Sequence, residues 1–156
     1  DANGRRPFNA NPVFARHLLA ADAAPPVAGA TLRGDLGSEQ AWRAVDADAR
    51  GRVDANASWA YANVESPAAR VMILALAGAS RVYVNGAGFA GDVYGFGFRG
   101  VPVALRAGRN DVYVTGIRGA FTCELWAPSS SAVVGDWDVT LPELVAGSNE
   151  GLTTRV

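Results

Sequence analysis

The sequence predicts an all-β protein, an antiparallel β-sandwich with a short N-terminal helix or arm. Three observations support this prediction. Short apolar segments recur at intervals of roughly 8–12 residues, turn residues such as glycine and asparagine separate them, and no long segment has helical periodicity. With 156 residues, 49% of them hydrophobic, the chain is long enough to bury a core of its own.

The first 30 residues are predicted to form an N-terminal arm. Asn11 supplies a helix N-cap, Pro12 suits the first helical turn, and Val13, Phe14 and Leu18 follow with the spacing of a short amphipathic helix. The sandwich domain is expected to span residues 31–128. Residues 129–156 are expected to be a tail, a linker or the start of a following domain, and an extra edge strand is the alternative.

Seven strands are predicted inside the sandwich domain. They cover residues 42–45, 58–64, 70–77, 81–84, 101–105, 111–117 and 121–126. In the second of these, alternation places Trp59 and Tyr61 on one face and Ala60 on the other. The third is almost continuously apolar, as expected of a central strand. The fifth and sixth are predicted to pair as a hairpin, and Trp42, Trp59 and Trp126 are assigned to the core.

Two sequence segments carry a family resemblance. Residues 81–86 read RVYVNG, and residues 101–115 read VPVALRAGRNDVYVT. A strand that ends in V-x-V-N-G, followed by V-x-L-x-x-G-x-N-x-V-x-V, resembles the jelly-roll sandwich of galactose-binding-like domains, including sugar-binding domains attached to glycoside hydrolases. The resemblance covers about residues 42–126. It implies a domain that binds sugars or other polymers, or one that braces a neighbouring catalytic domain.

A glycine- and aromatic-rich segment between two predicted strands is the candidate ligand site. It combines rings that could stack on a sugar with polar groups that could bond sugar hydroxyls. The predicted ligand-binding residues are Asn85, Phe89, Asp92, Tyr94, Phe96 and Arg99. The alternative is that these rings plug the end of the sandwich or face an adjacent domain, with Asp92 and Arg99 forming a surface ion pair.

Three aspartates close together in the sequence are a candidate calcium site. Asp46, Asp48 and Asp54 offer hard oxygen ligands, and the resemblance implies that a structural calcium ion occurs in related domains. The spacing departs from a full calcium loop because Arg50 stands where a ligand is needed. A bound calcium ion is therefore a hypothesis to test, and no other cofactor is expected.

The sequence offers few groups for catalysis, so we expect no enzymatic activity. His17 is the one histidine and lies in the arm, and Cys123 is the one cysteine and lies in an apolar segment. Residues 95–100 match G-x-G-x-x-G. A strand rather than a helix is predicted to follow them, which excludes a dinucleotide site.

Charge and composition limit the partners. The formal net charge of −1 leaves no basic face for nucleic acid, and no apolar run is long enough to span a membrane. All 14 basic residues are arginine, which favours a bacterial source. We expect a non-catalytic accessory module of a larger secreted or periplasmic hydrolase, which binds carbohydrate or polysaccharide. The alternative is a structural domain that contacts an adjacent catalytic domain and has no ligand.

Overall fold

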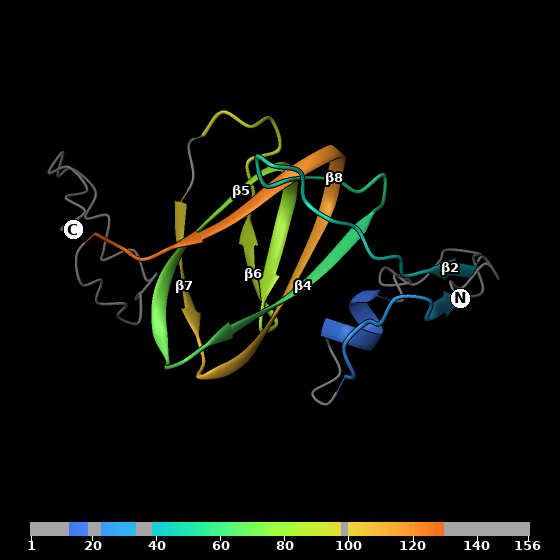
Figure 1. Ribbon diagram of the computed structural model, residues 1–156, viewed down its shortest axis with the longest axis horizontal. Coiled ribbons are helices and arrows are strands. Elements are labelled where there is room, and N and C mark those ends of the chain that lie inside the picture. Colours follow the sequence, from blue (N-terminus) through green and yellow to red (C-terminus); the bar gives the residue numbers. More distant parts are fainter. Residues whose placement is uncertain (1–12, 19–22, 34–38, 98–99, 130–156) are drawn as a thin grey trace, which may run out of the picture.

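The computed structural model describes residues 13–18, 23–33, 39–97 and 100–129. Apart from a five-residue π-helical turn, η1 (Phe14–Leu18), its regular structure in these ranges is β-strand, and all paired strands are antiparallel. The strands are β1 (Thr31–Arg33), β2 (Glu39–Ala41), β3 (Arg52–Asp54), β4 (Trp59–Ser66), β5 (Arg70–Val84), β6 (Ala87–Ala90), β7 (Gly100–Leu105) and β8 (Gly108–Trp126). The predicted fold class is confirmed (Figure 1).

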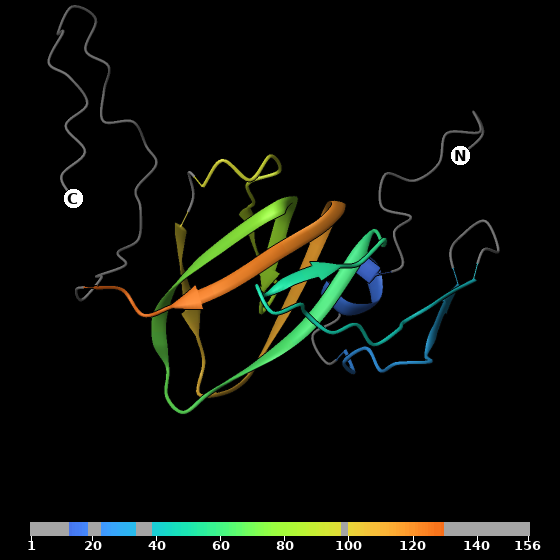
Figure 2. The same ribbon diagram turned by 45° about the horizontal axis from the view of Figure 1, so that its top comes forward.

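Two long strands, β5 and β8, organise the sandwich. Their ends near the β5–β6 turn pair with each other and are flanked by β4 and β6, which gives the order β4-β8-β5-β6. Their opposite ends also pair and are flanked by β7 and β3, which gives β7-β5-β8-β3. Figures 1 and 2 show both strands bending together at the top of the molecule. Each strand therefore belongs to both layers, as in sandwiches whose corner strands switch sheets at bulges.

Glycines make the shared bend possible. The pairing of β5 with β8 shifts register between Ala77 and Ala79, and Gly78 between them has a φ of +80°. A Cβ atom at Gly78 would overlap the carbonyl oxygen of Ala120 in β8. The sequence predicted separate strands on either side of each bend, at residues 70–77 and 81–84 and at residues 111–117 and 121–126. This prediction is wrong, because a bulge bends the chain while the backbone stays paired on both sides of it.

The predicted hairpin between residues 101–105 and 111–117 is also wrong. Strand β7 pairs with β5 in one layer, whereas the first half of β8 pairs with β4 in the other. The short connection between β7 and β8 thus carries the chain from one layer to the other. Buried polar contacts of Asn110 hold this connection, and local turn signals do not distinguish such a crossing from a hairpin.

The segment before β3 differs from its prediction too. Residues 42–45 were expected to form a strand, but the strand lies just before them, at β2, which pairs with β1 in a separate two-stranded ribbon. Residues 42–51 run as irregular chain toward β3. The sequence gives no sign that the strand ends before residue 42, because Trp42 and Val45 have good strand propensity and the glycine and aspartate of the turn come only after them.

Apolar side chains of the two layers form the core between them. Its buried members come mainly from β5, β7 and β8, and they are Ala55, Met72, Leu74, Leu76, Ala79, Val82, Val84, Val103, Leu105, Val112, Val114 and Phe121. The alternation predicted for β4 is confirmed, since Ala60 packs against this core and Trp59 and Tyr61 lie on the other face. Trp126 departs from its prediction: at the end of β8 it is 44% exposed.

The outer face of the β4-β8-β5-β6 layer carries a second apolar cluster. Tyr83 and Tyr113 are buried there, together with Val13 from the N-terminal arm, and Trp42 and Trp59 pack against them. The arm, in blue in Figure 1, is therefore docked on this face by aromatic contacts. In the described residues no helix is long and apolar enough to cross a membrane.

Candidate functional site

The predicted ligand loop begins at a buried aspartate that braces it. The backbone N–H of Asp92 donates to the carbonyl oxygen of Leu76 at 2.8 Å, and the carbonyl of Asp92 accepts from Gly78 at 2.9 Å. Its carboxylate accepts the backbone N–H of Gly97 at 2.6 Å. Asp92 therefore ties the loop to the bend of β5 and closes it on itself. Its carboxylate is therefore used in a hydrogen bond within the loop.

Two aromatic rings project from the braced loop into solvent. Tyr94 is 70% exposed and Phe96 is 64% exposed, and their ring centroids lie 5.6 Å apart at an interplanar angle of 36°. Gly95 and Gly97, which alternate with them, have φ values of +69° and +76°, a region that glycine enters without strain. The glycines thus allow the tight path on which the two rings stand side by side.

An arginine that the sequence analysis missed completes this group. The guanidinium carbon of Arg118 lies 5.8 Å from the centroid of the Tyr94 ring, within the range of a cation–π contact. Arg118 comes from β8, where Ile117 pairs with Ala79 of β5 close to the start of the loop. Only the pairing of β5 with β8 brings this residue to the loop, so local sequence patterns could not reveal it.

Other predicted ligand residues lie elsewhere. Phe89 packs against the core. Asn85 sits in the β5–β6 turn, at the opposite end of β6 from the loop, where its amide donates to Asn110 and its oxygen accepts from the backbone of Asp111. Arg99 lies outside the described residues. Of the predicted set, the structure brings together Tyr94 and Phe96, with Asp92 beneath them as a brace.

The three predicted calcium ligands do not form a cluster. Asp48 accepts the backbone N–H groups of Arg50 and Arg52 at 2.8 and 2.9 Å, and these hydrogen bonds lower the pKa of its carboxyl group. It thereby caps the turn that leads into β3. Asp46 and Asp54 are exposed, and in the described ranges no three acidic, histidine or cysteine side chains are placed to share a metal ion. The calcium site stays a prediction.

His17 belongs to the outer aromatic cluster. Its ring stacks near Tyr113, with centroids 5.9 Å apart, and meets Trp42 edge-on at 6.2 Å. Burial lowers the pKa of His17, and the charge of neighbouring Arg16 acts in the same direction. The imidazole is thus held in an apolar aromatic environment that favours its neutral form.

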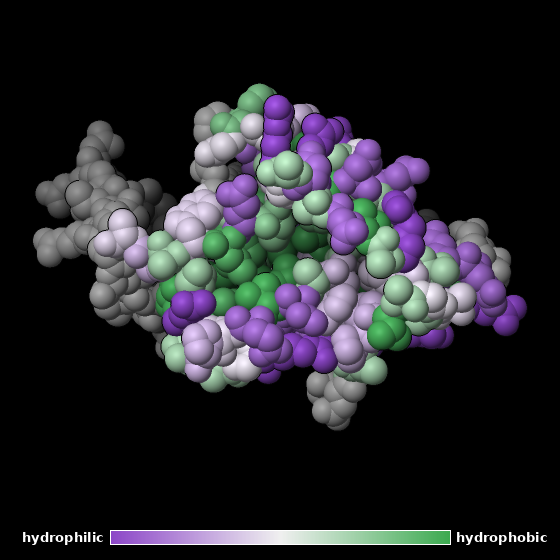
Figure 3. All heavy atoms as spheres, viewed as in Figure 1, coloured by the Kyte–Doolittle hydropathy of each residue, from purple (hydrophilic) through white to green (hydrophobic). Residues whose placement is uncertain are grey.

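A second candidate site is an apolar cleft that opens into the core beside β4. Figure 3 shows an apolar hollow rimmed by hydrophilic side chains on the face seen in Figure 1. The cleft has a volume of about 600 Å³. Its walls are formed by Pro26, Val27, Ala28, Ala41, Trp42, Arg43, Ala44, Val45, Ala47, Gly51, Val53, Ala55, Ala57, Trp59, Ala60, Tyr61, Ala62, Val112, Val114, Phe121 and Cys123.

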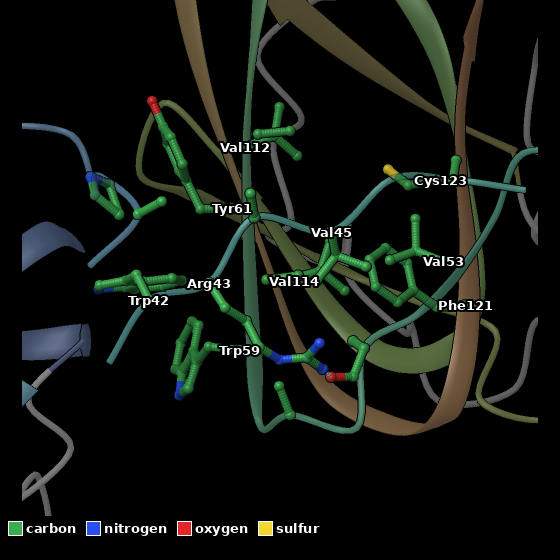
Figure 4. Close-up of a pocket in the computed structure, with 18 of the residues that line it drawn as sticks. Trp42, Arg43, Val45, Val53, Trp59, Tyr61, Val112, Val114, Phe121 and Cys123 are labelled. Carbon is green, nitrogen blue, oxygen red and sulfur yellow. Dashed lines mark hydrogen bonds between the residues drawn. The ribbon is translucent and has the colours of Figure 1, made fainter. Parts of the chain in front are cut away.

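Small side chains explain why the cleft stays open. Eight of its wall residues are alanine, including Ala60 and Ala62 on the inner face of β4. Val114 of β8 lies beside Ala60 in the same layer, Phe121 of β8 lies in the other layer, and Trp42 and Trp59 stand on one side (Figure 4). The alternation in residues 58–64 predicted which face of β4 the alanines occupy. It did not reveal that, within the described part of the chain, no larger side chain fills the space before them.

The polar groups of the cleft are few. Arg43 crosses its mouth and donates a hydrogen bond to the backbone carbonyl of Ala55. Cys123 lies in the wall formed by β8, where burial and then the charge of Glu124 raise the pKa of its thiol to about 11. The thiol is therefore protonated at neutral pH, which makes it a weak nucleophile.

Comparison of the chain with protein-family models, curated proteins and solved structures gave no match. The resemblance to galactose-binding-like domains therefore stays a prediction. Two features of the structure bear on its function, the exposed aromatic pair and the apolar cleft.

Proposed function

We propose that this chain is a non-catalytic accessory module that binds carbohydrate, with Tyr94 and Phe96 as its stacking platform. The observation that carries the proposal is the exposure of two adjacent aromatic rings on a loop that Asp92 braces from below. Large rings left in water on a well-held loop are unusual in a domain that has a core available to bury them, and they are typical of binding surfaces.

The chemistry of the platform suits a sugar ring. One face of a pyranose presents C–H groups, which pack on an aromatic ring, and its hydroxyl groups need hydrogen-bond partners at the edge. Tyr94 and Phe96 supply the apolar surface, and Arg118 supplies guanidinium N–H donors beside it. Because the two rings are tilted by 36° rather than coplanar, we expect each ring to contact a different part of a polysaccharide chain.

The settings of the one histidine and the one cysteine support a non-catalytic role. His17 is packed between aromatic rings on the outer face, and Cys123 has a raised thiol pKa. Neither arrangement provides an activated base or nucleophile. Such a domain is most useful as an accessory module of a secreted or periplasmic bacterial hydrolase.

A second candidate function is contact with an adjacent domain of a longer polypeptide. It is favoured by the internal roles of three predicted ligand residues, since Asn85, Phe89 and Asp92 make their contacts inside this domain. In that case Tyr94 and Phe96 would be anchors of a protein interface instead of a sugar platform.

Retention on insoluble polysaccharides, followed by a glycan array, tests the first proposal. The double variant Tyr94→Ala/Phe96→Ala should lose retention at least tenfold, about the effect expected from removing two stacking rings. Trp126→Ala, which removes an exposed ring outside the loop, is the matched control and should bind like the wild type. Equal retention of the double variant, or no retention of the wild type on any glycan, would remove the sugar platform and leave the domain contact.

A further inference from the structure

The apolar cleft beside β4 has the size of a ligand site. Its volume of about 600 Å³ lies inside the range of roughly 300–1,000 Å³ usual for small-molecule pockets. Protein interiors are packed nearly as densely as organic crystals, so a space of this size is not an ordinary packing fault. Its apolar walls would be more stable in contact with an apolar molecule than with water.

The walls define what could occupy the cleft. Alanine and valine side chains, with Trp42, Trp59 and Phe121, present carbon surface along its depth. This surface suits an alkyl chain or a flat hydrocarbon, which needs no hydrogen-bond partners along its length. A sugar would leave its hydroxyl groups without partners there, so the cleft and the Tyr94–Phe96 platform require different ligands.

One charge distinguishes the ligand further. Arg43 is the only ionisable group among the described wall residues other than the thiol of Cys123 and the phenol of Tyr61, and no carboxylate lies in these walls. A guanidinium has five N–H donors, and within the described part of the chain Arg43 uses them only toward the carbonyl of Ala55. The remaining donors can pair with an anion at the mouth of the cleft.

We infer that the cleft binds a single amphipathic anion, with its apolar tail between the alanines of β4 and the part of β8 in the other layer, at Phe121 and Cys123, and its carboxylate-like head at Arg43. The ligand is a free molecule that enters the cleft, not a membrane surface. This site is independent of the proposed sugar platform, so either of the two can fail without the other.

Three probes with the same alkyl tail test the inference. Decanoate, decan-1-ol and decyltrimethylammonium are titrated into the full chain below the concentrations at which they form micelles, and binding is measured by calorimetry. Decanoate should bind about tenfold more tightly than the alcohol, and the cation most weakly, because only the carboxylate pairs with Arg43. Equal affinity for all three, or no binding of decanoate, would overturn the inference.

The single cysteine reports where the probe binds. Cys123 lies in the cleft wall, so saturating decanoate should slow its reaction with N-ethylmaleimide at least fivefold. Binding of decanoate with no protection of Cys123 would place the probe elsewhere and refute the site. Vesicles of phosphatidylcholine with phosphatidylglycerol form a further arm. If the protein sediments with these vesicles and decanoate does not release it, the ligand is a membrane surface instead of a free anion.

Variants at the mouth and in the walls of the cleft test separately the effect of the Arg43 charge and the effect of the cleft's shape. Arg43→Gln should weaken decanoate about tenfold and leave the alcohol within about twofold, whereas Arg43→Lys should retain most of the preference for the anion. Ala62→Phe should abolish binding of both by filling the cleft. Ala104→Phe, at an exposed position of β7, is the control for adding a ring to a strand. If Ala62→Phe does not fold, the two Arg43 variants and the protection of Cys123 still test the inference.

Discussion

The side-chain amide of Asn85 donates a hydrogen bond of 2.8 Å to the side-chain oxygen of Asn110, which joins the β5–β6 turn to the start of β8. Asn110 is fully buried, and the same oxygen accepts the backbone N–H of Arg106. Its own amide group faces the carbonyl oxygens of Val64, Arg106 and Gly108 at 2.9–3.2 Å. One side chain thus links β4, the connection from β7 and the β5–β6 turn.

Asn110→Ala should therefore lower the free energy of unfolding by about 3 kcal/mol, because several buried backbone groups lose their partner at once. Asn110→Asp should be at least as damaging at neutral pH, although it has nearly the same shape, since a carboxylate oxygen would face three carbonyl oxygens. Urea denaturation measures both changes. Glu65→Ala, exposed on neighbouring β4, should stay within about 0.5 kcal/mol of the wild type. A tolerated Asn110→Asp would contradict this account.

The bend shared by β5 and β8 gives a second prediction from a matched pair of glycines. Gly78 and Gly119 have nearly equal φ values of +80° and +77°, but a Cβ atom would overlap the Ala120 carbonyl only at Gly78 and would meet nothing within 4 Å at Gly119. Gly119→Ala should cost about 1–2 kcal/mol of stability from backbone strain alone. Gly78→Ala should cost about 3 kcal/mol or more, or prevent folding.

Thermal melting of the two variants side by side checks this difference. Equal losses at both positions would mean that backbone conformation, rather than the close approach of β5 to β8, determines the requirement for glycine at the bend.

Strand content and facing were predictable from the sequence because they depend on local patterns. The alternation of β4 is visible in residues 58–64, and Asn85–Gly86 forms the expected turn with a φ of +50° at Asn85. Strand pairing was not predictable. Whether residues 106–110 make a hairpin or cross between layers depends on partners of Asn110 in β4 and in the β5–β6 turn, and these lie 46 and 25 residues away.

The candidate sites show the same limit. Exposure of Tyr94 and Phe96 agrees with glycine-rich flanks, which are visible in the sequence. Arg118 and the cleft depend on contacts between distant strands, and the alanines of β4 mark a cleft only once Arg43 and the core residues of β8 are placed around them. A periodic sequence pattern does not show how much of the space between the strands is filled by side chains.

The loop at the end of β6 allows a third prediction, which separates packing from binding. Phe89→Ala should lower stability by about 2 kcal/mol, because this ring packs against the core. Tyr94→Ala and Phe96→Ala should each change it by less than about 0.5 kcal/mol, because both rings are largely exposed. Urea denaturation of the three single variants gives the comparison. A large loss at Tyr94 or Phe96 would show that these rings stabilise the domain and are not available to a ligand.

The docking of the N-terminal arm should depend on pH through His17. Burial lowers the pKa of this histidine in the folded protein below its ordinary value of about 6.5, so on acidification the unfolded chain binds a proton before the folded chain does. Stability should therefore be complete above about pH 7 and should fall as the pH drops through 6.5 toward the lowered pKa. His17→Phe, which keeps an aromatic ring beside Trp42 and Tyr113, should lose this part of the pH dependence. Melting temperatures at pH 7.5 and 5.0 should differ by about 2 °C more in the wild type than in the variant, and parallel curves would show that the imidazole does not titrate against this aromatic cluster.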